Sequence, residues 1–493
     1  MLPFKTLITL DRTSSQALYQ QLAHELIKLI NKGVLNAGVK LPSSRIMSEI
    51  LSVHRKTIVS GYEELILQGW LETIPQKGTY VNNSLPKLKS ISPKEHVSHY
   101  NDKAGFQFNK EIGSDILNAQ LNTIHINDGI PDVRLAPTKQ IGQLFKEASN
   151  TMTLKPHLGY ESPLGTLKLR QTLTTYLSNT RGIKFGTEHI LTTRGSQMGI
   201  YLSAKALINL GDNIIVGETN YNSADLTFES FGAILKRVRV DEYGIVTDDI
   251  EVLCKMHKIK AVYVTSHHHH PTTVTLSADR RLHLLNLAQH YNFAIIEDDY
   301  DYDFHYKRAP ILPLAAYDTH GNVIYIGSFC KTVAPGYRIG YLIASKDFVK
   351  SCSNYRRSID RQGDLILEYA FSYFIERGEL TKHINKVMKI YEERRSYFCE
   401  QLIRLDSYIK FVYPTGGMAV WVTLKPPFSW AKLSLISNKF GLQLGDWKRY
   451  DYENTGHESI RIGFANFTRD EITEFVNRLE QLFKNQKGML MDS

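Results

Sequence analysis

The stretch FAIIEDDYDYDF, residues 293–304, decides the fold of most of this chain, together with VIYIGSFCK, residues 323–331. In each stretch a short apolar run ends in polar residues, which is typical of a buried strand whose carboxyl end borders a ligand crevice. Similar apolar runs occur at 213–216 and 261–265, with helical stretches between them. This alternation predicts an α/β domain with a largely parallel sheet beyond residue 121.

The composition excludes several broad classes of protein. The chain has 493 residues, 42% of them hydrophobic, which is enough for more than one large core. Its four cysteines form no CxxC pair, so neither a disulfide framework nor a zinc ribbon is expected, and a reducing cytoplasm is the simplest compartment. No uninterrupted apolar stretch approaches the ~18 residues of a membrane helix, so no membrane partner is expected.

The positive charge is concentrated near the N-terminus. Residues 1–89 contain 11 Lys and Arg against 6 Asp and Glu, whereas residues 90–493 contain 48 against 44. A small basic module ahead of a large, nearly neutral one is typical of a nucleic-acid binder joined to a second domain. A solvated basic face without a partner is the alternative explanation of the charge alone.

The N-terminal pattern predicts a winged helix. Leu18, Leu22, Leu26 and Ile30 follow i, i+4 spacing, which predicts one helix with an apolar stripe. After LPSS a short helix and a second one from about residue 54 to 68 form a helix-turn-helix, and the second helix begins with the donors HRKT. Residues 70–81 predict a hairpin wing around Pro75-Gln76-Lys77.

The segment LPSSRIMSEILSVHRKTIVSGYEELILQGWLETIPQKGTYV, residues 41–81, resembles the GntR family of winged-helix regulators. It departs from the family at Ser52 and His54, where Gly and Ser are usual. The resemblance implies contacts with double-stranded promoter DNA. The residues expected at that interface are Ser44, Arg45, Arg55, Thr57, Lys77 and Gly78, with Lys56 as a further donor at the start of the second helix.

The chain is expected to have three parts. Residues 1–82 form the DNA-binding domain, 83–120 a linker and 121–493 the α/β domain. The linker is polar, lacks periodicity and contains prolines. If flexible, it spans roughly 35 Å, enough to bring the basic domain beside a neighbouring subunit.

A carboxylate and an amine near the strand ends suggest pyridoxal phosphate chemistry. Asp298 ends one strand, and Lys331 follows another. The aldehyde of pyridoxal 5'-phosphate requires an amine to form a Schiff base, and the ring nitrogen requires a carboxylate to hold its proton. A simple salt bridge between Asp298 and Lys331 is the alternative.

The phosphate of such a cofactor requires backbone N–H groups at a helix start, hydroxyls and a guanidinium. Gly195-Ser196-Gln197 opens a predicted helix, and Ser328 and Arg338 lie close to Lys331 in the sequence. These residues are therefore the expected phosphate ligands.

The remainder of the chain resembles the fold-type I aminotransferases, and with the GntR-like segment it is similar to the MocR subfamily of transcription regulators. The motifs are LGYESPLGTLKLRQTL (158–173), TTRGSQMGIYL (192–202), IIEDDYDYDF (295–304), GSFCKTVAPGYRIGYLIA (327–344) and SIRIGFAN (459–466). The resemblance implies that Lys331 carries the cofactor, that Asp298 faces its ring nitrogen, that Tyr300 lies near its hydroxyl and that Tyr221 stacks on its ring. It also implies that Ser196, Gln197, Ser328 and Arg338 hold the phosphate, that Tyr160 reaches the phosphate of the neighbouring subunit in a homodimer, and that Arg461 binds a carboxylate of the substrate or effector.

The segment VTSHHHHPTTVTL, residues 264–276, departs from the family pattern. His268 or His270 could approach the cofactor ring or its hydroxyl, while Thr273 replaces a usual Gly. Four consecutive histidines also raise the alternative of a metal site. Adjacent side chains on an extended backbone point to opposite faces, however, so four in a row cannot easily share one ion, and no metal is expected.

Two functions follow from these features. In the first, the chain is a pyridoxal-phosphate-dependent transcription regulator whose large domain senses the cofactor or a small amino compound. In the second, it is an active aminotransferase, since Lys331, Asp298 and Arg461 are the groups that transamination needs. The basic N-terminal module has no use in a plain transaminase and therefore favours the regulator. Residual transaminase activity of such a regulator is kept as an alternative. The effector, the operator and the sign of regulation are not encoded in any motif.

Overall fold

The computed structural model describes residues 2–85, 104, 106–107, 123–151, 158–306, 311–444, 447–452 and 455–491. Contacts divide the chain into two compact units, Met1–Asp115 and Ile116–Ser493. The segment expected to be a linker, 83–120, lies largely outside the described residues.

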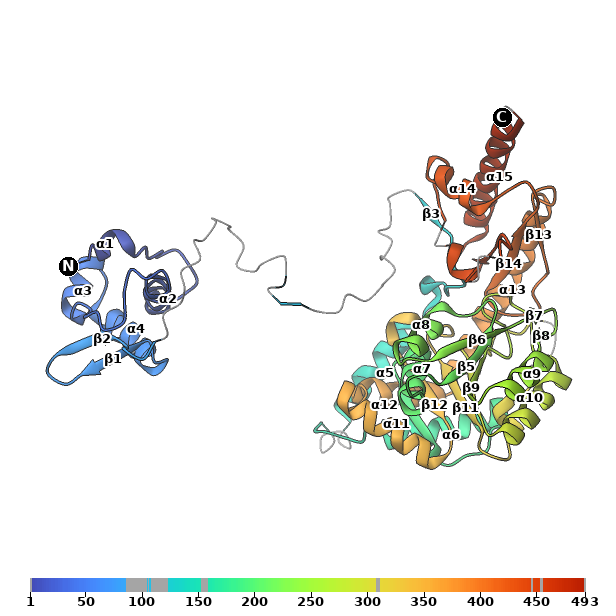
Figure 1. The fold of residues 1–493 in the computed structure, drawn as a ribbon, viewed down its shortest axis with the longest axis horizontal. Helices are drawn as coiled ribbons and strands as arrows, with labels where there is room; N and C mark the ends of the chain where they lie inside the picture. Colours follow the sequence, from blue (N-terminus) through green and yellow to red (C-terminus); the bar gives the residue numbers. More distant parts are fainter. Residues whose placement is uncertain are drawn as a thin grey trace. The chain divides into compact units, whose positions relative to one another are not determined.

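The first unit is a small helical domain with a two-stranded hairpin (Figure 1). Leu22, Leu26, Ile58 and Leu65 are completely buried in its core, which confirms the apolar stripes read from the sequence. The Ser43 side chain caps the third helix by accepting from Ile46 N. The elements are α1 (Phe4–Leu7), α2 (Leu18–Asn31), α3 (Ser44–Leu51), α4 (Arg55–Leu67), β1 (Leu71–Ile74) and β2 (Gly78–Val81).

The second unit is built on a seven-stranded sheet of order β4-β12-β11-β10-β9-β5-β6. Strands β11, β10, β9, β5 and β6 pair in parallel, whereas β12 pairs antiparallel with both β11 and β4. The sheet is therefore mixed, and the expected parallel arrangement holds for all of its strands except β12. The strands are β4 (Ile190–Thr193), β5 (Asn213–Gly217), β6 (Ile234–Val238), β9 (Ile259–Val264), β10 (Ala294–Asp299), β11 (Val323–Ser328) and β12 (Gly340–Ile343).

Helices cover both faces of this sheet because successive strand residues point to opposite sides. Ile214 and Ile296 pack on the side of α7, α8 and α11, while Ile215 and Ile295 pack on the side of α9 and α10. Further helices cover the β4 end of the sheet. The helices are α5 (Thr138–Asn150), α6 (Leu167–Arg181), α7 (Ser196–Leu207), α8 (Asn222–Ser230), α9 (Thr247–Met256), α10 (Ala278–Tyr291), α11 (Lys346–Ile359) and α12 (Leu365–Glu376), and β7 (Val240–Asp241) pairs with β8 (Gly244–Ile245).

A smaller C-terminal region packs a three-stranded antiparallel sheet against long helices (Figure 1). The segment that opens the second unit joins this region, because β3 (Ile124–His125) pairs in parallel with β15 (Leu442–Gln443). The remaining elements are α13 (Glu379–Ile403), β13 (Ile409–Phe411), β14 (Ala419–Leu424), α14 (Trp430–Ile436), β16 (Ser459–Gly463) and α15 (Arg469–Met491).

The topology gathers polar residues at one edge of the large sheet. Strands β5, β9, β10 and β11 run in the same direction, so their carboxyl ends meet at that edge. The turn after β3 supplies a further wall of the same region. This edge is where an open α/β sheet most often binds its ligand.

Candidate functional site

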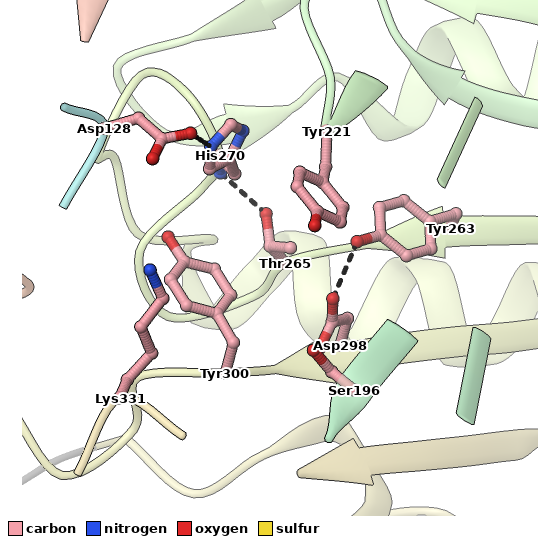
Figure 2. Close-up of a pocket in the computed structure, with 9 residues that line it drawn as sticks. All are labelled: Asp128, Ser196, Tyr221, Tyr263, Thr265, His270, Asp298, Tyr300 and Lys331. Atoms are coloured by element: carbon pink, nitrogen blue, oxygen red, sulfur yellow. Dashed lines mark hydrogen bonds and ion pairs between the residues drawn. The ribbon is translucent and has the colours of Figure 1, made fainter. Parts of the chain in front are cut away.

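A cavity lies at the carboxyl edge of the large sheet, with side chains from many parts of the chain around it (Figure 2). Six of the residues predicted for a cofactor line it together. They are Ser196, Tyr221, His270, Asp298, Tyr300 and Lys331, and the other lining residues are Asp128, Tyr263 and Thr265.

Lys331 follows β11 and carries a buried amine. Its Nζ donates to the backbone oxygen of Gly129 over 2.7 Å. Burial lowers the pKa of Lys331, and the charge of Arg461 lowers it further, although Asp128 acts in the opposite direction. A lowered pKa increases the fraction of neutral amine, which is the nucleophilic form.

Asp298 lies within β10 and is 2% exposed. The Tyr263 hydroxyl donates to its Oδ2 over 2.9 Å, while its Oδ1 is buried without a hydrogen-bond partner among the described residues. Burial raises the pKa of Asp298 to about 7, helped by the nearby charges of Asp299 and Asp301 and opposed by Tyr263 and Lys331. The Asp298 carboxyl is therefore partly protonated near pH 7, and its Oδ1 is available to a group that enters the cavity.

Three aromatic side chains form further walls. The Tyr221 and His270 rings lie edge to face with centroids 5.1 Å apart. The Tyr300 hydroxyl donates to the backbone oxygen of His268 over 2.8 Å. Burial lowers the pKa of His270 to about 4 despite its contact with Asp128, so the imidazole is neutral at pH 7.

The predicted phosphate ligands surround the start of α7. Ser196 is its first residue and lines the cavity, and Gly195 before it has φ 78°. A side chain at position 195 would lie 3.0 Å from Nη2 of Arg338, so the guanidinium is beside this helix start. Ser328 is less free, because its Oγ accepts from Cys330 N over 3.1 Å.

The Gln197 side chain is directed toward α8 instead. Its Nε2 donates to Oγ1 of Thr227 over 2.9 Å, and its Oε1 is buried and unpartnered among the described residues. Only the backbone N–H of Gln197, near the helix start, is well suited to an anion in this conformation.

Five of the predicted residues lie outside the cavity wall: Gln197, Ser328 and Arg338, described above, and also Arg461 and Tyr160. Arg461, on β16, is 2% exposed and donates to the Tyr300 hydroxyl over 3.1 Å. Tyr160 is 81% exposed, and the Arg361 guanidinium lies 4.1 Å from the centre of its ring.

The other histidines of the run at 267–270 are buried in separate contacts. His267 Nδ1 lies 3.1 Å from Asp299, His268 Nδ1 lies 2.9 Å from Asp301, and His269 Nδ1 lies 2.9 Å from the Thr272 hydroxyl. Within the described ranges, no group of three or more His, Cys, Asp or Glu side chains is arranged to hold a metal ion.

Three residues of the cavity wall were not predicted from the sequence: Asp128, Tyr263 and Thr265. Tyr263 and Thr265 are close to the end of β9, which was recognised as a strand, so strand direction could have found them. Asp128 follows the two-residue strand β3, whose partner β15 is more than 300 residues away, and local pattern carries no signal for such a contact.

The residues predicted for DNA binding are in the first unit. Arg45, Arg55, Lys56, Lys77 and Gly78 are exposed. Arg55 Nε donates to Ser44 Oγ over 3.3 Å, which joins the starts of α3 and α4. Thr57 is half-buried. Ser44, Lys77 and Gly78 line one surface cleft between α4, the start of α3 and the hairpin.

The fold and the cavity define a class of protein, a winged helix joined to a fold-type I aminotransferase domain. Comparison with known proteins agrees. The chain belongs to the aminotransferase class I and II family, whose model matches residues 132–479, and the model of the bacterial regulatory proteins of the gntR family matches residues 18–81.

Two relatives match this chain over nearly their whole length. An uncharacterized HTH-type transcriptional regulator of Bacillus subtilis, YdfD, is 25% identical over 94% of this chain and 96% of its own. The probable rhizopine catabolism regulatory protein MocR of Rhizobium meliloti is 23% identical over 97% of this chain and 96% of its own. The expected MocR-type architecture is thereby confirmed, and the chain is a GntR-type helix-turn-helix transcriptional regulator with an aminotransferase-like domain.

A solved structure supports the fold of the large domain. The kynurenine aminotransferase of Pyrococcus horikoshii, in complex with PMP, superposes with a TM-score of 0.68 at 28% identity, covering 74% of this chain and 91% of that one. In the parts of the present chain that the structure describes, no helix is both long and apolar enough to cross a membrane.

The cavity fits the cofactor of this family, pyridoxal 5'-phosphate. Among the residues that the structure describes, Asp298 Oδ1 is a buried acceptor without a partner, as a protonated ring nitrogen requires. Lys331 offers the amine, and the start of α7 offers backbone donors for a phosphate.

Proposed function

We propose that this protein is a transcription regulator that binds pyridoxal 5'-phosphate at Lys331 and senses a small amino compound there. The observation that carries this proposal is a single cavity lined by both Lys331 and Asp298, with Tyr221 and Tyr300 on its walls. When bound, the cofactor supplies an aldehyde that reacts reversibly with amines.

Different residues of the chain would hold different parts of that cofactor. Lys331 would provide the attachment point, and Asp298 would hold a proton at the ring nitrogen. Tyr221 would cover the ring, and Tyr300 and His270 would lie on the side of its hydroxyl. The start of α7 with Ser196, Gln197, Ser328 and Arg338 forms the phosphate end, completed by Tyr160 from the second subunit of a homodimer.

The winged helix binds double-stranded promoter DNA. Its exposed donors Arg45, Arg55, Lys56 and Lys77 would contact phosphates and base edges, together with Ser44, Thr57 and Gly78. An effector can shift DNA affinity only if it binds two conformations of the protein differently, so effector and DNA affinities must be coupled.

Absorption spectroscopy tests the cofactor site. Purified protein mixed with pyridoxal phosphate should develop a visible band that free cofactor lacks, and Lys331→Ala should abolish it. Lys205→Ala, which removes a lysine of α7 that packs beside Phe231, is the matched control and should keep the band. Colour retained in Lys331→Ala would reject the assignment.

An active aminotransferase is the second candidate, because Lys331 and Asp298 are both present in the cavity. Incubation with an amino acid and a keto acid distinguishes the two. The regulator predicts no sustained turnover beyond the amount of protein, whereas many turnovers per subunit at ordinary enzyme rates would make transamination the function.

A further inference from the structure

A second cavity of the large unit is lined by residues that take no part in the cofactor cavity. Its wall comes from the turn after β5, from β7 and Thr272, from β14 and β16, and from the segment that precedes β16. Its volume of about 270 Å³ is close to the lower limit, roughly 300 Å³, of known small-molecule sites. The second cavity thus has room for a small ligand.

Two carboxylates give the second cavity a negative charge. Glu218 Oε1 accepts from Val240 N over 3.1 Å, and Asp451 Oδ2 accepts from Gly456 N over 2.7 Å. Burial favours the neutral form of Asp451. The N–H groups of Gly456 and Thr455 and the Thr455 hydroxyl outweigh burial and lower the pKa of Asp451, so this carboxylate is ionised at pH 7. These donors are neutral, and no cation among the described residues forms an ion pair with either carboxylate.

No positive side chain offsets this charge within the cavity wall. In the part of the chain that the structure describes, the wall contains neither lysine nor arginine. His457 Nδ1 accepts from Ser459 N over 3.2 Å, and Nε2 donates to the Tyr450 backbone oxygen over 2.7 Å, so the imidazole carries one proton and is neutral.

The positive side chains that are closest to this wall in the sequence all contact other groups. Arg237 pairs with Asp225, Arg239 with Asp249 and Arg449 with Asp128, while Arg461 donates to the Tyr300 hydroxyl and Lys448 lies over the ring of Trp447. The negative charge of the second cavity is therefore not cancelled by its immediate surroundings.

The same wall contains aromatic rings and a buried hydroxyl. Trp421 and Tyr450 lie edge to face, with ring centroids 5.5 Å apart. Aromatic rings attract organic cations through their faces. Thr219 is 8% exposed, and its Oγ1 is buried without a hydrogen-bond partner among the described residues. Buried polar atoms are rarely left unsatisfied, so this hydroxyl is suited to a polar group of a ligand.

We propose that the second cavity binds a small organic cation of the ammonium class without forming a covalent bond. Its carboxylates and aromatic rings attract a positive charge, and the same carboxylates repel an anion. Its hydroxyl groups accommodate a polar group on the same ligand. This site is distinct from that of pyridoxal phosphate, and the inference does not depend on the proposed function.

The second cavity is a neighbour of the cofactor cavity. The Tyr450 ring centroid lies 6.4 Å from that of His270, and the Thr272 hydroxyl lies 2.9 Å from Nδ1 of His269. A primary amine could therefore give a signal from either place, since it also reacts with the cofactor aldehyde. A quaternary ammonium cannot form a Schiff base and reports only non-covalent binding.

Choline and its uncharged analogue dimethylbutanol, in which carbon replaces the nitrogen, are a matched pair of probes. Each is titrated into the full-length protein in an isothermal calorimeter, with tetramethylammonium as a second cation and sodium chloride as the ionic control. Choline should bind about tenfold more tightly than dimethylbutanol, because only choline carries the charge. Tetramethylammonium should bind as well, and sodium chloride should give only heat of dilution.

Variants of the two carboxylates locate the binding. Glu218→Gln and Asp451→Asn each keep an oxygen that can accept from the backbone, and each should weaken choline binding about fivefold by removing a charge. Asp347→Asn, on the exposed start of α11, should bind choline like wild type. Circular dichroism identifies the variants that fold, and two separate substitutions guard against the loss of one.

Three results would overturn the inference. They are equal binding of choline and dimethylbutanol, no binding of either quaternary cation at millimolar concentration, and a choline affinity that neither carboxylate variant changes. None of these measurements involves the amine of Lys331, so each leaves the proposed function standing.

Discussion

At the scale of single residues, Asp298 shows how burial prepares a side chain for its proposed task. A carboxyl with a pKa of about 7 retains a proton under conditions in which an exposed aspartate has lost it. That property suits a group that must share a proton with a ring nitrogen. Burial of this carboxyl also destabilises the folded chain whenever the carboxyl is ionised without a partner.

This cost predicts a pH dependence of stability in protein freed of cofactor. Because the folded pKa exceeds the unfolded value, the folded state binds more protons between pH 4 and 7, so the free energy of unfolding falls as pH rises through this window. The difference between 3.8 and about 7 corresponds to on the order of 4 kcal/mol.

Asp298→Asn should remove this slope. The variant should gain stability relative to wild type as pH rises from 4 to 7, as measured by urea unfolding at each pH. Asp347→Asn, at an exposed position, serves as the control. Parallel pH profiles for wild type and Asp298→Asn would show that the buried carboxyl does not titrate in this range.

At the scale of elements, the start of α4 is the part of the winged helix with the clearest expected role. Ser52 adopts the left-handed conformation with φ 52°, which explains why a glycine is usual there, and His54 caps α4 by accepting from Lys56 N. The turn thus forms despite both departures from the family pattern, and it leaves Arg55 exposed at the helix start.

Arg55→Ala should weaken binding to promoter DNA about tenfold, because one phosphate or base contact is lost. The slope of log binding constant against log salt concentration should become less steep by about one. Fluorescence anisotropy across a salt series measures both quantities. Lys32→Ala, an exposed lysine just beyond α2, should bind like wild type. An unchanged salt slope in Arg55→Ala would exclude that residue from the interface.

The sequence predicted those elements whose signals are local. The apolar stripe of α2 and the strands β5, β9, β10 and β11 were all found, because burial imposes a regular pattern on neighbouring residues. The strands β4, β6 and β12 were not predicted, and the antiparallel direction of β12 carries no local signal, since the direction of a strand in a sheet depends on its connections. Asp128 was missed because a distant strand holds its turn in place.

At the scale of the whole molecule, Tyr160 is the residue that we propose links the site to assembly. Its ring is largely exposed within one chain, as expected of a side chain that reaches into a second subunit. A closed homodimer would bury such a surface twice, once in each copy.

Tyr160→Phe should lower the affinity for pyridoxal phosphate about tenfold without changing the mass of the assembly, because one hydrogen bond to a charged phosphate is lost. Spectral titration measures the affinity, and light scattering measures the mass. Tyr201→Phe, an exposed tyrosine of α7 that packs against Phe231, is the matched control. Equal affinity for Tyr160→Phe and wild type would remove this residue from the cofactor site.

The proposed function rests on the claim that one lysine carries the cofactor, and chemical trapping can test this claim. Wild-type protein loaded with pyridoxal phosphate is reduced with borohydride, digested and mapped by mass spectrometry. We predict a single phosphopyridoxyl group, located on Lys331. A label on another lysine with Lys331 unmodified, or no label at all, would contradict the claim.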